Sequence, residues 1–163
     1  MSVDTKIFLM LHKFVSKRKG LKKALYFINI GSSLFFVALY TGCVLWLLIS
    51  LDQLLIKFLL VPALVLMTVT ILRKVINRKR PFEVLEIEPI MIHDADGSFP
   101  SKHASSAMII ALSVYWINPI AGWVCICLAL FTAISRVLAG VHYPLDVLTG
   151  IFISLLFSIL FFI

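Results

Sequence analysis

The amino-acid sequence predicts an all-α membrane protein, a polytopic bundle of about five transmembrane helices with an amphipathic N-terminal helix on the membrane surface. Of its 163 residues, 61% are hydrophobic and 14% are charged, whereas a soluble domain of this size needs a more polar surface. The apolar residues are gathered into runs of about 20, the length that crosses a bilayer. Charges, prolines and short polar turns separate the runs. We therefore expect one domain, residues 1–163, whose core is helix packed against helix.

Residues 1–30 predict an interfacial segment. Lysine and arginine recur through residues 1–23, and apolar residues follow helical spacing among them; these are Ile7, Leu11, Phe14 and Val15. A helix with one apolar and one basic face lies at the membrane surface. A lipid-binding recruitment device is the alternative to a simple anchor. Residues 24–30 fit either a second interfacial turn or the start of the first span.

Five apolar runs predict the spans. They cover residues 32–51, 54–72, 101–118, 119–138 and 144–163. Asp52-Gln53 forms the turn after the first span, and Asn118-Pro119 forms the turn before the fourth. The helix of the second span should end by about Arg80, because a residue that precedes proline avoids helical geometry. A polar loop, residues 82–99, follows; its acidic residues are Glu83, Glu86, Glu88, Asp94 and Asp96.

The order of these spans places three polar clusters on one side of the membrane. The second span ends at residues 73–80, and the third begins at residues 101–103. Two crossings later, the fourth span ends at Arg136 and the fifth begins near His142. Because two crossings return the chain to the same side, the three clusters meet by parity. Every lysine and arginine except Lys57 then shares that side, which the positive-inside rule predicts to be cytoplasmic.

The stretch from Ser135 to Asp146, S-R-V-L-A-G-V-H-Y-P-L-D, contains the strongest candidates for chemistry. Arg136 follows an uncharged run, and a guanidinium at the end of a membrane helix is costly unless an anion meets it. Pro144 favours a helix start, so Asp146 falls in the first turn, where the helix dipole stabilises its charge. From there Asp146 can accept a hydrogen bond from His142 and fix which ring nitrogen is free.

The groups that converge on this side suit a phosphate. They are the cations Arg73, Arg80, Lys102 and Arg136 and the imidazoles of His103 and His142. Guanidinium groups match phosphate oxygens, and fixed cations stabilise the charge that develops in phosphoryl transfer. Ser101 begins a helix whose backbone N–H groups form an anion site, and its hydroxyl either caps that helix or donates to a phosphate oxygen. An oriented neutral imidazole is the candidate nucleophile, and the second histidine is the candidate general acid. The chain has no G-x-x-x-x-G-K-[ST] loop, so hydrolysis of a nucleoside triphosphate is not supported.

These clusters resemble the three-part signature of the type 2 phosphatidic acid phosphatase superfamily, which includes lipid phosphatases, vanadium haloperoxidases and glucose-6-phosphatase. The signature reads K-x(6)-R-P, P-S-G-H and S-R-x(5)-H-x(3)-D. The third part is complete from Ser135 to Asp146. The second part is P-S-K-H, with Lys102 in the glycine place, and the first has Arg73 in the lysine place before Arg80 and Pro81. The resemblance extends over residues 73–150.

The resemblance implies a role for each matching residue. His142 would attack phosphorus and form a phosphohistidine, with Asp146 as its partner, and His103 would protonate the leaving group and then activate water. The phosphate would be held by Arg73, Arg80, Arg136, Ser101 and the backbone N–H of Lys102. The family's reaction needs no metal and no other cofactor. We expect the two departures, arginine at 73 and lysine at 102, to change substrate preference rather than to abolish activity.

The expected function is that of a small lipid phosphatase of the cell membrane, acting on undecaprenyl pyrophosphate, phosphatidic acid or phosphatidylglycerophosphate. The net charge of +7 indicates contact with anionic lipid headgroups rather than with nucleic acid. Two other functions fit parts of the pattern: a haloperoxidase that binds vanadate in the same pocket, and a non-catalytic protein that binds anionic lipid. Many membrane relatives of this family work on the outer face, which conflicts with the cytoplasmic side that the charges predict.

Other polar residues have simpler interpretations. His93, Asp94 and Asp96 are a candidate divalent-metal site, but a solvated loop is the favoured interpretation. We interpret His12 as an ordinary interfacial residue.

Overall fold

The computed structural model describes residues 1–85, 87–91 and 97–163. Within these residues the chain forms helices and no strand, which confirms the predicted all-α class. The helices are α1 (Val3–Ser16), α2 (Lys19–Ile49), α3 (Leu54–Ile76), α4 (Pro81–Val84), α5 (Lys102–Ile117), α6 (Pro119–Leu138), α7 (Pro144–Ser158) and a final 3₁₀ turn, η1 (Ile159–Phe161). Glu86, His93, Asp94 and Asp96 lie outside the described residues, and with them the candidate metal site of the loop.

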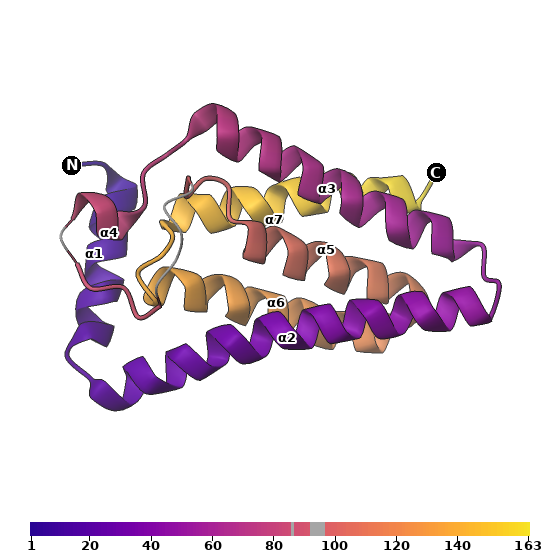
Figure 1. Ribbon diagram of the computed structural model, residues 1–163, viewed down its shortest axis with the longest axis horizontal. Helices are drawn as coiled ribbons and strands as arrows, with labels where there is room; N and C mark the ends of the chain where they lie inside the picture. The colour runs from indigo at the N-terminus through magenta and orange to yellow at the C-terminus, as the bar shows by residue number, and fades with distance from the viewer. Residues whose placement is uncertain (86, 92–96) are drawn as a thin grey trace.

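The long helices alternate in direction, and α1 crosses one end of the bundle (Figure 1). α5 packs against α2, α3, α6 and α7. The end of α3, the short α4, the start of α5, the end of α6 and the start of α7 all gather at the end that α1 crosses. This arrangement confirms that the three polar clusters share one side of the bundle.

Four stretches of the described residues are long and apolar enough to cross a membrane, namely α2, α3 continued to Val84, α6, and α7 together with η1 (Pro144–Phe161). The predicted third span is α5, whose 16 residues reach only about 24 Å, short of a hydrocarbon core of about 30 Å. The number of full-length spans therefore differs by one from the predicted five. α5 is instead a core helix, because its neighbours bury it from Ala104 to Val114 on most sides. The chain is a membrane protein.

The N-terminal region differs in two details from the prediction. α2 begins at Lys19, so residues 24–30 belong to the first span. His12 is buried rather than interfacial, because the inner face of α1 packs on the loop between α6 and α7. The opposite face of α1 exposes apolar side chains, as an interfacial helix requires; these are Val3, Ile7, Met10 and Phe14.

Local capping explains where the helices begin and end. The Asn118 side chain accepts a hydrogen bond from the Ala121 N–H at 3.0 Å, and Pro119 occupies the first position of α6. Asn77 ends α3 in the left-handed conformation. Pro144 occupies the first position of α7. The starts at Pro119 and Pro144 coincide with the starts that the sequence predicts for the fourth and fifth spans.

Gly122 allows α6 to approach α5 closely. A β-carbon at this position would collide with the backbone of Tyr115 on α5, whereas a β-carbon at Gly42 of α2 would meet nothing within 4 Å. We expect Gly122→Ala to destabilise the protein by about 1–3 kcal/mol and Gly42→Ala to leave it unchanged or slightly more stable, because alanine favours a helix. Thermal unfolding of both variants in detergent measures the difference. Equal midpoints for the two variants would contradict this close approach.

Candidate active site

His142 lies in the five-residue loop, residues 139–143, between α6 and α7, and it is fully buried. Gly140 has a φ of +84°, which lets the chain turn before the histidine. Arg80 fixes the same loop, since its Nη1 donates a hydrogen bond to the Val141 carbonyl at 3.2 Å. The sequence places His142 and Asp146 four residues apart, and the fold orients both side chains toward the same buried space.

The carboxylate of Asp146 lies beside the imidazole. Its Oδ2 accepts a hydrogen bond from the Tyr143 N–H at 2.8 Å and lies 3.5 Å from Nδ1 of His142. That separation is long for a hydrogen bond but short for an electrostatic contact. Among the described residues neither ring nitrogen of His142 has a hydrogen-bond partner. Because Nδ1 faces the carboxylate, Nε2 is the nitrogen that is left to react.

The surroundings keep His142 neutral. Burial lowers the pKa of His142 from its ordinary value of 6.5 to about 4; Asp146 opposes this change, and the positive charges of Arg80 and Arg73 reinforce it. A neutral imidazole is the form that can act as a nucleophile, so the site holds its candidate nucleophile in the reactive form at neutral pH.

Three buried arginines come from three different segments. Arg73 is in the last turn of α3, Arg80 precedes α4, and Arg136 is in the last turn of α6, with exposures of 5%, 2% and 1%. Arg73 and Arg80 act electrostatically on His142, and Arg80 acts on Arg136. Buried cations gathered around a neutral imidazole form a site that favours an anion.

Arg136 also has partners that the sequence did not reveal. Its Nη2 donates to the Asn29 carbonyl at 3.1 Å and to Oγ of Ser33 at 2.6 Å, both on α2. A guanidinium has five N–H donors, so these bonds orient Arg136 and still leave donors for an anion. α2 therefore helps to position a candidate phosphate ligand.

The start of α5 connects the second cluster to the third. Oγ of Ser101 accepts a hydrogen bond from the Ala104 N–H at 3.4 Å and so caps the helix, while the Ser101 N–H donates to the Asp146 carbonyl at 2.9 Å. Lys102 and Arg73 line a cavity of about 300 Å³ at the end of α3. The side chain of Lys102 thus lies in the same cavity as a candidate phosphate ligand.

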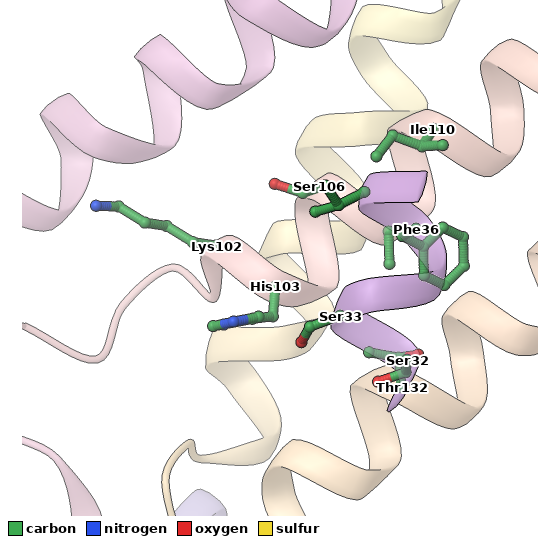
Figure 2. Close-up of a pocket in the computed structure, with 10 residues that line it drawn as sticks. Ser32, Ser33, Phe36, Lys102, His103, Ser106, Ile110 and Thr132 are labelled. Carbon is green, nitrogen blue, oxygen red and sulfur yellow. The ribbon is translucent and has the colours of Figure 1, made fainter. Parts of the chain in front are cut away.

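His103 lines a second cavity, between α2, α5 and α6, which Lys102 also lines (Figure 2). This groove has a volume of about 300 Å³. Most of its wall is apolar, from Phe36, Val37 and Ile110. Val37 is 63% exposed on a helix that faces lipid, so the groove opens at the membrane-facing surface. His103, in the first turn of α5, therefore lies where the apolar groove meets the end of the bundle that holds the polar clusters.

The structure adds one side chain, Arg78, that the sequence analysis did not single out among residues 73–80. Nη1 of Arg78 lies 2.7 Å from Oδ1 of Asp146, and Nη2 lies 2.7 Å from Oδ2 of Asp4 on α1. A buried carboxylate needs a charged partner, but the sequence analysis did not predict that Asp146 is buried, so it gave no signal for a further cation. The sequence alone did not say which cation it was.

The chain is similar to several known proteins. The family model described as the PAP2 superfamily matches residues 54–163. Undecaprenyl-diphosphatase BcrC of Bacillus subtilis (strain 168) is 36% identical over 83 residues, which are 51% of this chain and 43% of that protein. Lipid A 1-phosphatase of Rhizobium johnstonii is 25% identical over 154 residues, 91% of this chain and 53% of that protein. The chain thus spans roughly half the length of these curated relatives. The crystal structure of Aquifex aeolicus LpxE shares the fold, with a TM-score of 0.81 at 21% identity, over 98% of this chain and 94% of that one.

Proposed function

The chain belongs to the PAP2 superfamily, and we propose that it is a membrane lipid phosphatase that hydrolyses a phosphate monoester or pyrophosphate of a lipid through a phosphohistidine, without a metal. The family resemblance that the sequence suggested is confirmed by this match. One observation carries the proposal. A neutral, fully buried imidazole lies among buried arginines, at the end of the bundle where an apolar groove begins.

The proposed reaction has two steps. The arginines Arg73, Arg80 and Arg136 hold the phosphate. Nε2 of His142 attacks phosphorus, the bond from phosphorus to the lipid oxygen breaks, and His103 gives a proton to that leaving oxygen. His103 then removes a proton from water, the water oxygen attacks phosphorus, and the phosphorus–nitrogen bond breaks to restore neutral His142. Asp146 stabilises the positive charge that the ring carries in the intermediate.

The groove beside His103 supports a lipid as the leaving group. An acyl or prenyl chain can lie against its apolar wall while the phosphate reaches the polar end of the bundle. The candidate substrates are undecaprenyl pyrophosphate, phosphatidic acid and phosphatidylglycerophosphate. Lys102 shares a cavity with Arg73, so it favours a substrate with a second phosphate group.

Phosphate release tests the proposal. The full chain, purified in detergent with EDTA, should release phosphate from at least one of the three candidate lipids. Bromide oxidation with vanadate and peroxide, and no hydrolysis, would support a haloperoxidase instead. Binding of anionic vesicles without any release would support the non-catalytic alternative.

The buried imidazole predicts a pH dependence of stability. The pKa of His142 is about 4 in the folded protein and about 6.5 in an unfolded chain. Between these values the unfolded chain binds a proton that the folded protein does not, so the free energy of unfolding falls as the pH is lowered from about 6.5 to about 4. The full loss is about 3 kcal/mol, and His142→Gln should lack it. Thermal midpoints of the parent protein and of His142→Gln at pH 7.5 and 4.5 measure the loss. If the midpoints of the two proteins differ by the same amount at both pH values, the predicted pH dependence is wrong.

We also propose that the site faces the cytoplasm. Lys57 is in the first turn of α3, which lies at the end of the bundle opposite α1 (Figure 1), and it donates to the Phe161 carbonyl at 3.3 Å. The segments that contain the other lysines and arginines lie toward the end that holds the site. In intact cells, Lys79→Cys should react with a permeant maleimide and resist an impermeant one. The parent chain is the control, since its cysteines lie within α2 and α6. Labelling by the impermeant reagent would place the site outside.

A further inference from the structure

Asp146 is a fully buried carboxylate, and both of its oxygens are held. Oδ2 accepts from the Tyr143 N–H and faces His142, while Oδ1 accepts from Nη1 of Arg78 at 2.7 Å. Leaving a buried carboxylate without a cation is strongly unfavourable. Arg78 is therefore the cation that pairs with Asp146 and fixes the plane of its carboxylate.

Arg78 is itself held on two further sides. Its Nη2 donates to Oδ2 of Asp4 at 2.7 Å, and its guanidinium lies over the Tyr143 ring, 3.9 Å from the ring centroid. The side chains of Arg78 and Asp4 are 26% and 15% exposed, so solvent screens the pair only in part. A planar guanidinium between two carboxylates and on an aromatic face has one favourable orientation.

α1 contacts the His142 loop on both sides. Oδ1 of Asp4 accepts from the Leu145 N–H at 3.0 Å, in the first turn of α7. Phe8 packs edge-on against the Tyr143 ring, with centroids 5.5 Å apart. His12 lies against Gly140: a β-carbon built on this glycine would be 3.3 Å from Cε1 of His12. α1 thus packs against the segment that carries the candidate nucleophile.

We propose that Arg78 is a positioning residue for the reaction and that Asp4 of α1 holds it, so that docking of α1 completes the active site. The proposal rests on the proposed phosphatase function. Arg78 touches no reacting atom; it acts through Asp146. When His142 carries the phosphoryl group, its ring is positively charged, and the carboxylate has to be ionised and aligned at that moment.

A double-mutant cycle with a neighbouring control tests both parts. Arg78→Gln should lower kcat by about 10- to 100-fold and change KM by less than about threefold, since the phosphate ligands are untouched. Arg78→Lys should recover part of the loss, because it keeps the charge but not the fork. Asp4→Asn should cause a smaller loss, and the double variant Asp4→Asn/Arg78→Gln should be no slower than Arg78→Gln alone, because the two act as one unit. Lys79→Gln, an exposed neighbour, should match the parent protein.

Each outcome decides one part. A kcat within twofold of the parent in Arg78→Gln, or an equal loss in Lys79→Gln, would overturn the positioning role. Multiplying losses in the double variant would overturn the link to α1.

A readout that does not need turnover separates this proposal from the phosphatase function. Histidine NMR identifies the His142 resonance by its loss in His142→Gln. The charged groups that face this ring are Asp146, Arg80 and Arg73. Without Arg78 the buried carboxylate of Asp146 loses its cation and its alignment, so it supports a positive charge on the ring less well. The pKa of His142 should therefore fall further in Arg78→Gln and not in Lys79→Gln. An unchanged titration would refute the link even in a protein that hydrolyses no lipid, and a parent protein without hydrolysis would refute the phosphatase function alone.

Discussion

Replacing His142 with alanine should lower phosphate release by at least about 10³-fold, because the reaction loses the atom that attacks phosphorus. The buried arginines would still hold the phosphate, but water alone would have to displace the lipid oxygen. Initial rates with the best of the candidate lipids measure the loss. A ³²P-labelled lipid, quenched in base during turnover, should also label the parent protein through a phosphorus–nitrogen bond and leave the variant unlabelled.

Folding has to be controlled in this experiment, because His142 is fully buried and alanine leaves a cavity. His142→Gln keeps more of the volume and should be equally inactive. Both variants should retain a cooperative thermal transition in detergent at pH 7.5. Turnover near the parent rate in either folded variant would rule out His142 as the nucleophile.

Replacing His103 with glutamine should lower turnover of a lipid phosphate by about 10²- to 10⁴-fold, the usual contribution of a general acid. The loss should depend on the leaving group. Nitrophenolate leaves readily without a proton. Formation of the phosphohistidine from p-nitrophenyl phosphate should therefore slow much less in this variant than its formation from a lipid phosphate. Burst amplitudes and steady-state rates with both substrates separate this step from the attack of water.

The comparison with His142→Ala makes the test specific. The nucleophile variant should be inactive on both substrates, whereas the His103 variant should keep the burst with the aryl phosphate. Ser106→Ala, which changes another polar residue of the same groove, should behave like the parent on both. A burst that slows equally with the two substrates in His103→Gln would point to a role in binding, not in proton transfer to the leaving group.

The sequence by itself determined the fold class, most helix boundaries and the meeting of the three clusters. Apolar runs long enough to cross a bilayer leave few alternatives, since every backbone polar group has to be satisfied inside the membrane. Caps such as Asn118-Pro119 act within one turn and are therefore readable locally. Parity needs only the number of crossings, so it brought His142 to the side of Arg73 and Arg80 without any contact being known. The roles of these residues remain predictions that the variants above test.

Only the tertiary structure decided which predicted span is a short core helix and which side chains hold the site in place. α5 can be 16 residues long because four other helices surround it, and no local pattern reports such burial. The hydrogen bond from Arg136 joins residues 107 apart, and those from Arg78 join residues 68 and 74 apart. A basic run offers several cations to a distant carboxylate, and only the packing of α1, α3 and α7 selects Arg78. Motif spacing is set along the chain, whereas partners at such separations are set by how the helices pack.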